Sequence, residues 1–200
     1  DVERVDAPAG APDLAVARSA TAAQIIEMLI RVSDNEAAEV MLRHVALATG
    51  APATFAGGAG AVVEALDDLG VDTDGLQLFD GSGLSRRNQI SPTTLVEVVR
   101  RGLSTPGAAA VVDDLPVSGF SGSLSSRFAR ADAGLVQAKT GTLTGIRSLA
   151  GYAIDADGRP VVFAVMIDRV DRAQTFASQL ALDDVAAAIV DCSCGAAGAD

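Results

Sequence analysis

The segment from Ser148 to Val170 restricts the possible folds more than any other part of the sequence. It reads SLAGYAI, then a turn at DADGR, and then PVVFAVMIDRV. Two apolar runs joined by a short polar turn are typical of a β-hairpin, and a strand as apolar as the second is covered on both faces. Because hairpin strands pair antiparallel, the sequence predicts an antiparallel sheet covered by helices, an α+β arrangement within the broad α/β class.

Helical patterns before the hairpin supply part of the covering layer. Residues 1–13 are acidic and rich in Pro and Gly, and we interpret them as a linker or the end of an inserted domain. One helix is predicted after Thr21, which has capping-box spacing to Gln24, and a second after Ser33, which is spaced in the same way from Glu36. The apolar face of the first helix is Ile25, Ile26, Leu29 and Ile30, and that of the second, which ends at Gly50, is Ala37, Val40, Met41, Val45 and Ala48.

The remaining elements follow from similar signals. GGAGAVVEALDDLG is interpreted as a loop that leads into a short helix, and DGSGLSRRNQISP as a compact polar loop. Further helices are predicted over about residues 93–104 and 173–190.

Charge and composition exclude several functions. The net charge of -11 and the lack of a basic stripe argue against nucleic-acid binding and against a polybasic membrane-surface role. No stretch of the sequence contains the run of about eighteen consecutive apolar residues that a membrane-spanning helix needs. Cys192 and Cys194 are too few for a zinc site and, being two residues apart, would make a strained pair with each other. We therefore expect inert thiols, or a disulfide from one of them to a cysteine outside the chain.

Counting residue types narrows the chemistry. The one histidine, His44, lies in a helical pattern among apolar neighbours, and a lone histidine lacks the partners for a metal site or a Ser-His-Asp triad. The Gly-x-Ser-x-Gly turn of many hydrolases is also absent, because GFSGS lacks the final glycine. We expect neither a metal nor a cofactor.

The one lysine, Lys139, stands out in a chain with fourteen arginines, between an apolar run and Thr-Gly-Thr. An ammonium followed by the hydroxyls of Thr140 and Thr142 along a strand edge suits a substrate carboxylate. Gly141 would let a substrate backbone lie close to the strand. Ser33-Asp34-Asn35 could carry a proton and hold a peptide carbonyl, although such a sequence is also a good helix cap.

Together these motifs resemble a known family. Ser-Asp-Asn and Lys-Thr-Gly belong to the signature of penicillin-binding proteins and class A β-lactamases. RVSDNEAAEVMLRH, DGSGLSRRNQISP, LPVSGFSGSL and AKTGTLTGIRSLAGY resemble the low-molecular-mass, class C penicillin-binding proteins, the D-alanyl-D-alanine carboxypeptidases and endopeptidases of peptidoglycan. The likeness covers about residues 14–170 and implies a β-lactamase/transpeptidase-like catalytic domain of which residues 14–200 are the C-terminal part.

The resemblance also implies roles for single residues. Ser33 would relay a proton to the leaving amine, and Asn35 would hold the substrate amide and orient the catalytic lysine. Lys139, Thr140 and Thr142 would bind the terminal D-Ala carboxylate, with Gly141 between them, and the backbone N–H of Thr142 would form half of the oxyanion hole. In the DGSGLS loop beside the site, Asp80, Ser82 and Ser85 are expected to support the turn rather than act in the chemistry.

One departure from the family pattern is decisive for the activity. The family's nucleophile lies in a Ser-x-x-Lys motif, but the residue three places before the one lysine is Val136. In class C members a large insertion separates Ser-x-x-Lys from Ser-Asp-Asn. We therefore expect the nucleophile outside these 200 residues, on an N-terminal part of the same gene product that packs against this chain.

Three functions stay open on the sequence. The first is a serine-type D-Ala-D-Ala carboxypeptidase, possibly also an endopeptidase, that acts on peptidoglycan stem peptides outside the cytoplasm and is acylated by β-lactam antibiotics. The second is a non-catalytic module that binds stem peptides. The third is a class A β-lactamase, which needs a glutamate and an asparagine about thirty residues after Ser-Asp-Asn. Here Glu64 has no asparagine after it, so this function ranks last.

Overall fold

A computed structural model describes residues 4–128 and 132–194. The three strands are β1 (Val136–Leu143), β2 (Ile146–Ile154) and β3 (Pro160–Ile167). The helices are α1 (Ala22–Val32), α2 (Asn35–Ala48), α3 (Phe55–Asp68), α4 (Pro92–Ser104), α5 (Ala109–Asp113) and α6 (Thr175–Val190), with short 3₁₀ turns η1 (Gly122–Leu124) and η3 (Arg172–Gln174).

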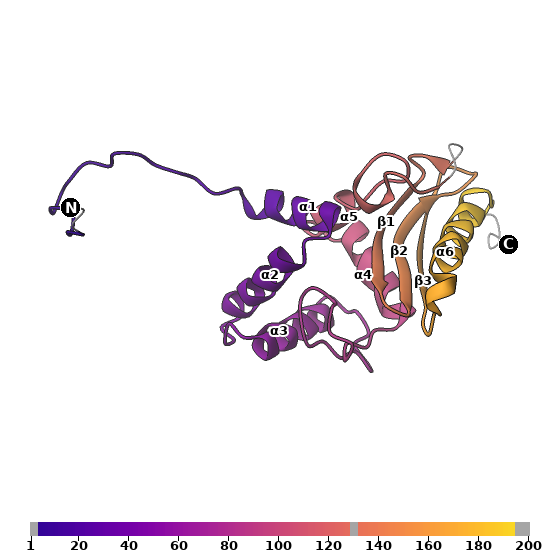
Figure 1. Cartoon of the computed structure of the whole chain (residues 1–200), viewed down its shortest axis with the longest axis horizontal. Coiled ribbons are helices and arrows are strands. Elements are labelled where there is room, and N and C mark those ends of the chain that lie inside the picture. Colours follow the sequence, from indigo (N-terminus) through magenta and orange to yellow (C-terminus); the bar gives the residue numbers. More distant parts are fainter. Residues whose placement is uncertain (1–3, 129–131, 195–200) are drawn as a thin grey trace.

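The strands form one antiparallel sheet in the order β1-β2-β3. Figure 1 shows this sheet between α4 on one side and α6 on the other, and both helices contact β2 and β3. The predicted hairpin, the antiparallel sheet and its cover of helices on both faces are thus confirmed. β1 lies at the edge of the sheet, with Lys139 opposite Ala150 of β2.

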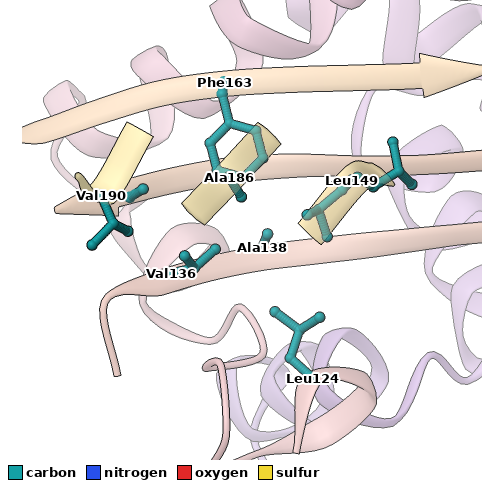
Figure 2. Packing of buried hydrophobic residues seen from close by; sticks show 9 residues of the cluster. Leu124, Val136, Ala138, Leu149, Phe163, Ala186 and Val190 are labelled. Carbon is teal, nitrogen blue, oxygen red and sulfur yellow. The ribbon is translucent and has the colours of Figure 1, made fainter. Parts of the chain in front are cut away.

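The main core lies between the sheet and α6 (Figure 2). Leu149 and Phe163 of the sheet pack there with Leu182 and Ala186 of α6, and Leu124 joins them from η1. Burying a side chain as large as leucine or phenylalanine stabilises a fold by about 1.5–3 kcal/mol. Because Leu124 of η1 belongs to the core, the loop that contains η1 is held against the β1 edge of the sheet (Figure 2).

The junction of α1 and α2 differs in part from the prediction. The capping box of Thr21 and Gln24 is present at the start of α1. The predicted box of Ser33 and Glu36 was wrong, because Asp34 is the N-cap of α2 and accepts a hydrogen bond from the backbone N–H of Ala37. Ser33 instead ends α1 in the left-handed conformation (φ 58°). An aspartate caps a helix at least as well as a serine, and this arrangement leaves the Ser33 hydroxyl free of the cap.

The packing of α2 and α3 was also predicted imperfectly. The fully buried residues of α2 are Leu42 and Ala46, whereas Val40 is half exposed, so the buried stripe is rotated from the predicted one. The glycines of GGAG lie inside α3 and not in a loop. The reason is tertiary: a Cβ at Gly58 would lie 2.5 Å from the Cγ of Leu42, so only glycine lets the two helices approach so closely.

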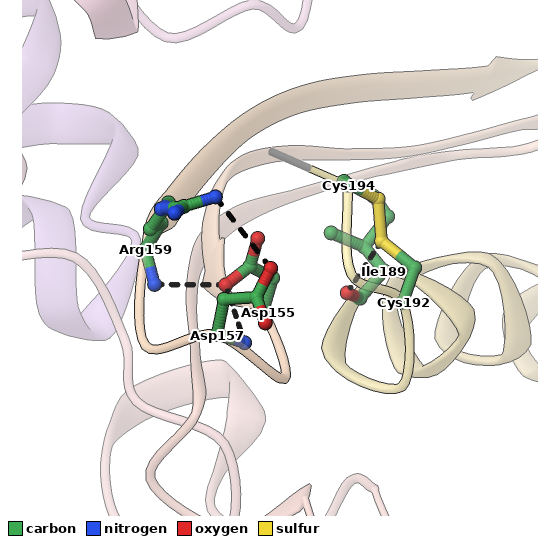
Figure 3. The surroundings of a disulfide bond; sticks show 6 residues. All are labelled: Asp155, Asp157, Arg159, Ile189, Cys192 and Cys194. Atoms are coloured by element: carbon green, nitrogen blue, oxygen red, sulfur yellow. Dashed lines mark hydrogen bonds and ion pairs between the residues drawn. A yellow bond between two sulfur atoms is a disulfide. The ribbon is translucent and has the colours of Figure 1, made fainter. Parts of the chain in front are cut away.

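The cysteine prediction was wrong. Cys192 and Cys194 form a disulfide with each other just after α6, with Cα atoms 5.2 Å apart, a distance that a disulfide can span (Figure 3). The carbonyl of Cys192 accepts a hydrogen bond from the N–H of Ala156, in the turn between β2 and β3. The cysteine pair therefore lies next to that turn and far along the chain from the Ser-Asp-Asn and Lys-Thr-Gly motifs.

The described part of the chain before α1, residues 4–21, contains no helix or strand, and its side chains are exposed. Figure 1 shows it extending away from the rest of the molecule. The proposed division at residue 13 stays a prediction. Among the described residues, no helix has the length and apolar character that crossing a membrane requires.

Candidate active site

The side chains of Ser33 and Lys139 meet although 106 positions separate them in the sequence. The Lys139 Nζ donates a hydrogen bond to the Ser33 Oγ over 2.7 Å and a second to the carbonyl of Thr140 over 3.1 Å. The Ser-Asp-Asn and Lys-Thr-Gly motifs are therefore in direct contact in the folded chain. The lysine and the serine thus form one polar centre.

The turn between α1 and α2 places Ser33 at this centre. The backbone N–H groups of Ser33 and Asp34 both bond to the carbonyl of Leu29, which closes the last turn of α1. The Asp34 carboxylate then opens α2 by accepting from Ala37. Since the Asp34 carboxylate accepts from the N–H of Ala37, one of the helix N–H groups that have no partner within the helix, the Ser33 hydroxyl is not needed as a cap and is available to Lys139.

The environment of Lys139 alters its acidity. Burial lowers the pKa of Lys139 from its usual value of 10.5, because removing an ammonium from water disfavours the charged form. The lysine is nevertheless only partly enclosed, since it lines an open cleft. A desolvated cation of this kind attracts an entering carboxylate more strongly than one in bulk water does.

The residues after Lys139 form the edge of the sheet. The first half of β1 pairs outward with the preceding loop, through Ser118 N–H to the Val136 carbonyl and Ala138 N–H to the Pro116 carbonyl. Among the described residues, the outer edge of β1 makes no further hydrogen bond to another backbone group after Ala138. The half of the strand that starts at Lys139 can therefore accept an extended peptide as an added strand.

Gly141 has a reason within the sheet besides the one expected. It lies opposite Ser148 of β2, and a Cβ on Gly141 would lie 2.1 Å from the Ser148 Oγ. The Ser148 side chain occupies that space and also lines the cleft. A larger residue at position 141 would displace a polar side chain of the cleft.

A cleft of about 430 Å³ collects most of the predicted site residues. Its walls come from the α1–α2 turn, the DGSGLSRRN loop and strands β1 to β3. Eight of the nine predicted residues line it, namely Ser33, Asn35, Ser82, Ser85, Lys139, Thr140, Gly141 and Thr142.

The ninth predicted residue, Asp80, shapes the loop from behind the cleft. Its carboxylate accepts hydrogen bonds from the N–H groups of Gly83 (3.0 Å) and Ser85 (2.5 Å) and from the Asn88 amide (2.7 Å). The Ser82 Oγ donates to the carboxylate of Glu39 on α2 over 2.6 Å. These bonds are those of a fixed turn, which fits the supporting role expected of this loop.

Sequence reasoning missed several residues of the site. Glu39 holds the DGSGL loop on α2 through Gly81 and Ser82. Arg86 lines the cleft and donates to the carbonyl of Thr144 over 2.7 Å, which joins the loop to the turn after β1. Ser123 of η1 accepts a hydrogen bond from the Thr140 hydroxyl over 2.9 Å. All three residues lie inside segments that carry the family resemblance, but nothing in those segments indicated the contacts that each makes.

Two residues weighed for other mechanisms lie elsewhere. Glu64 is an exposed residue of α3 and lines a separate, larger cavity of about 1000 Å³ between α3 and residues 73–79. His44 is exposed on α2. Glu64 is thus not placed to activate a water in the cleft beside Ser33 and Lys139.

A comparison with protein families decides the relationship. A model described as the D-Ala-D-Ala carboxypeptidase 3 (S13) family matches residues 1–189. The chain belongs to the S13 family. This confirms the resemblance drawn from the Ser-Asp-Asn, DGSGLSRRN and Lys-Thr-Gly segments.

Individual relatives named as carboxypeptidases agree with this assignment. Carboxypeptidase DacB of Mycolicibacterium smegmatis is 39% identical over 194 residues, which are 94% of this chain and 41% of that protein. The D-alanyl-D-alanine carboxypeptidase of Actinomadura sp. is 38% identical over 167 residues, 79% of this chain and 31% of that protein.

Solved structures confirm the fold of the S13 chain. Penicillin binding protein 4 of Haemophilus influenzae superposes with a TM-score of 0.77 at 27% identity, over 84% of this chain and 40% of that one. The helix-covered antiparallel sheet is therefore the fold of penicillin-binding catalytic domains. The chain spans about two fifths or less of the length of these relatives, with shares of 41%, 31% and 40%.

Proposed function

We propose that this chain is the C-terminal part of a serine-type D-Ala-D-Ala carboxypeptidase that cleaves peptidoglycan stem peptides through an acyl-enzyme. The nucleophilic serine would come from a Ser-x-x-Lys motif in a segment outside these 200 residues. The observation that carries this proposal is the hydrogen bond from Lys139 to Ser33, which joins a cation and a hydroxyl at an open strand edge.

The reaction would follow from this arrangement. The upstream serine oxygen forms an ester bond to the carbonyl carbon of the penultimate D-Ala, and the bond to the terminal D-Ala nitrogen breaks. The proton lost by the serine hydroxyl passes through Ser33 to the leaving amine, and Lys139, which donates a hydrogen bond to the Ser33 oxygen, orients the Ser33 hydroxyl for this relay. Water then hydrolyses the ester, which releases the shortened peptide and restores the serine hydroxyl.

Substrate binding would use the rest of the cleft. Lys139, Thr140 and Thr142 supply a cation and two hydroxyls for the terminal carboxylate. The open edge of β1 supplies backbone groups for the peptide, and the N–H of Thr142 would serve as one oxyanion donor. Asn35, at the first position of α2 and on the cleft wall, would hold the substrate amide.

The comparisons support a penicillin-sensitive enzyme that works on the cell wall. The Haemophilus protein of similar fold has also been solved in complex with a β-lactam, and that structure superposes with a TM-score of 0.75 at 28% identity. β-Lactams and stem peptides are accordingly the proposed ligands. The proposed location is extracytoplasmic, since peptidoglycan is there.

The test is release of D-Ala from an acyl-D-Ala-D-Ala peptide by the longer protein that includes the upstream segment. We expect turnover by the unaltered protein and a loss on the order of 100-fold in kcat with Ser33→Ala, the size of a missing proton relay. Peptide binding without any D-Ala release would overturn the proposal in favour of the stem-peptide-binding module. An upstream segment without Ser-x-x-Lys would do the same.

A further inference from the structure

The hydroxyls of Thr140 and Ser123 form a pair at one end of the cleft. The Thr140 Oγ1 donates to the Ser123 Oγ over 2.9 Å. Thr140 lines the cleft, whereas Ser123 is absent from its wall and belongs to η1. Ser123 therefore contacts Thr140, which is proposed to bind the substrate carboxylate, but does not itself line the cleft that the substrate would occupy.

The position of Ser123 is fixed by its neighbours along the chain. Leu124 is fully buried in the core, and its carbonyl accepts from the N–H of Gly119 over 3.0 Å. On the other side Gly122 has a positive φ (53°) and lies against the carbonyl of Arg31, where a Cβ would be only 2.3 Å away. A side chain between two such anchors is held in place although it is itself exposed.

The same loop is tied to the sheet and to α6. The Ser118 Oγ, fully buried, donates to the Asp132 carbonyl and accepts from the N–H of Val136 at the start of β1. Further on, Arg127 forms a buried ion pair with Asp183 of α6. These contacts anchor the loop with Ser123 to the strand that carries Thr140.

Hydroxyl chemistry gives this pair a function. A hydroxyl has one proton to donate and can accept as well. When Thr140 turns its proton to a substrate carboxylate, its oxygen loses the bond to Ser123 unless Ser123 then donates in the reverse direction. An accepting oxygen makes its own proton a stronger donor, because hydrogen bonds in a chain polarise one another.

We infer that Ser123 is a positioning residue for recognition of the substrate's terminal carboxylate, acting through the hydroxyl of Thr140. This inference rests on the proposed function and adds a residue to the same site. Ser123 holds the Thr140 side chain in one rotamer while the site is empty and donates to its oxygen when the anion is bound. Its contribution depends on the negative charge of the substrate.

The experiment compares two thioester substrates with the longer protein, one ending in a thioglycolate carboxylate and the other in its amide. We expect Ser123→Ala to lower kcat/KM for the acid about fivefold, the effect of one lost neutral hydrogen bond, mainly through KM. The amide should react unchanged. Ser123→Thr keeps the hydroxyl and should restore the acid substrate, and Ser125→Ala, an exposed serine two residues along the same loop, should behave as the unaltered protein.

The outcomes separate the inference from the proposed function. If Ser123→Ala lowered kcat/KM equally for the acid and the amide, or lowered the melting temperature enough to account for the lost activity, Ser123 would have a structural role only. If Ser123→Ala left kcat/KM for the acid substrate unchanged, Ser123 would have no role in carboxylate recognition. Failure of the unaltered protein to cleave either thioester would instead overturn the proposed function and this inference with it.

Discussion

At the scale of single residues, the proposed chemistry depends on one cation. Lys139 is the only lysine, and its Nζ reaches both Ser33 and a backbone carbonyl of its own strand. A lysine presents a compact charge on a flexible stem, whereas the guanidinium of arginine is larger and planar. The other fourteen basic residues of the chain are arginines, so the need for a positive charge does not by itself explain a lysine at position 139.

We therefore expect Lys139→Arg to slow acylation by a penicillin on the order of 100-fold, because the guanidinium would occupy the space of the carboxylate and lose the Ser33 contact. Stability should change little, since the position lies on an edge strand at the rim of a cleft. Fluorescent-penicillin labelling rates and a thermal melt of the same sample measure the two effects. Labelling at the unaltered rate would mean that Lys139 has a structural role only.

The acidity of Lys139 gives a second prediction at this scale. Burial lowers its pKa below the usual 10.5, so the cation is complete at low pH and is lost as pH rises through the lowered pKa. We expect kcat/KM for a carboxylate substrate, which reports the free enzyme, to decline on the alkaline side with an apparent pKa below 10.5. The residual activity of Lys139→Arg should lack this decline because arginine does not titrate there. The same alkaline decline in both proteins would assign it to another group.

The site residues were predictable to the extent that they belong to short motifs. Ser33, Asn35 and Lys139 could be named because their residue types and order carry a chemistry that a family shares. Glu39, Arg86 and Ser123 could not, because each acts through a contact made only in the folded chain, such as the 43-residue separation between Glu39 and Ser82. The wrong capping box at Ser33 has the same origin: two adjacent residues can both cap, and only the structure shows that Asp34 does.

At the scale of elements, the site depends on how η1 holds the end of α1 against β1. Strands β1 to β3 and helix α4 followed from local patterns, since alternation and apolar runs are encoded over a few residues. The glycine-containing start of α3 and the buried face of α2 did not, because the contact between Gly58 and Leu42 decides both. The close approach of two helices at a glycine is therefore the feature of this fold that is hardest to predict from local sequence patterns.

Gly122 tests this arrangement. We expect Gly122→Ala to destabilise the longer protein by about 3 kcal/mol, because the new methyl group would overlap the Arg31 carbonyl in addition to the backbone strain. Gly107→Ala is the control: its φ of 88° is also positive and unfavourable for alanine, but nothing lies within 4 Å, so only about 1 kcal/mol should be lost. Denaturant unfolding gives both values. Equal losses would show that the contact with α1 is not tight.

At the scale of the whole molecule, the chain presents apolar surface in a particular place. Helix α1 has an apolar face but no fully buried residue, and Met28 and Val32 are 42% and 61% exposed. Monomers rarely leave a contiguous apolar face of a helix in water. Together with the two-fifths coverage of its relatives, this favours an upstream segment of the same protein as the cover of α1.

This cover can be measured by amide hydrogen exchange. We expect the amides of α1 to exchange at least tenfold more slowly in the longer protein than in residues 1–200 alone, because a packed helix opens less often. The amides of β2, which lies in the middle of the sheet, should differ much less and serve as the internal reference. Similar exchange of α1 in both proteins would place the upstream segment elsewhere.

The most direct measurement of the central claim is the site of penicillin attachment. The longer protein and residues 1–200 alone would each be incubated with benzylpenicillin and analysed by intact mass and by peptide mapping. The account predicts one penicilloyl adduct on the longer protein, at the serine of an upstream Ser-x-x-Lys, and none on residues 1–200 alone. An adduct on a serine of these 200 residues, or none on the longer protein, would contradict the claim that Ser33 and Lys139 form one half of a composite active site.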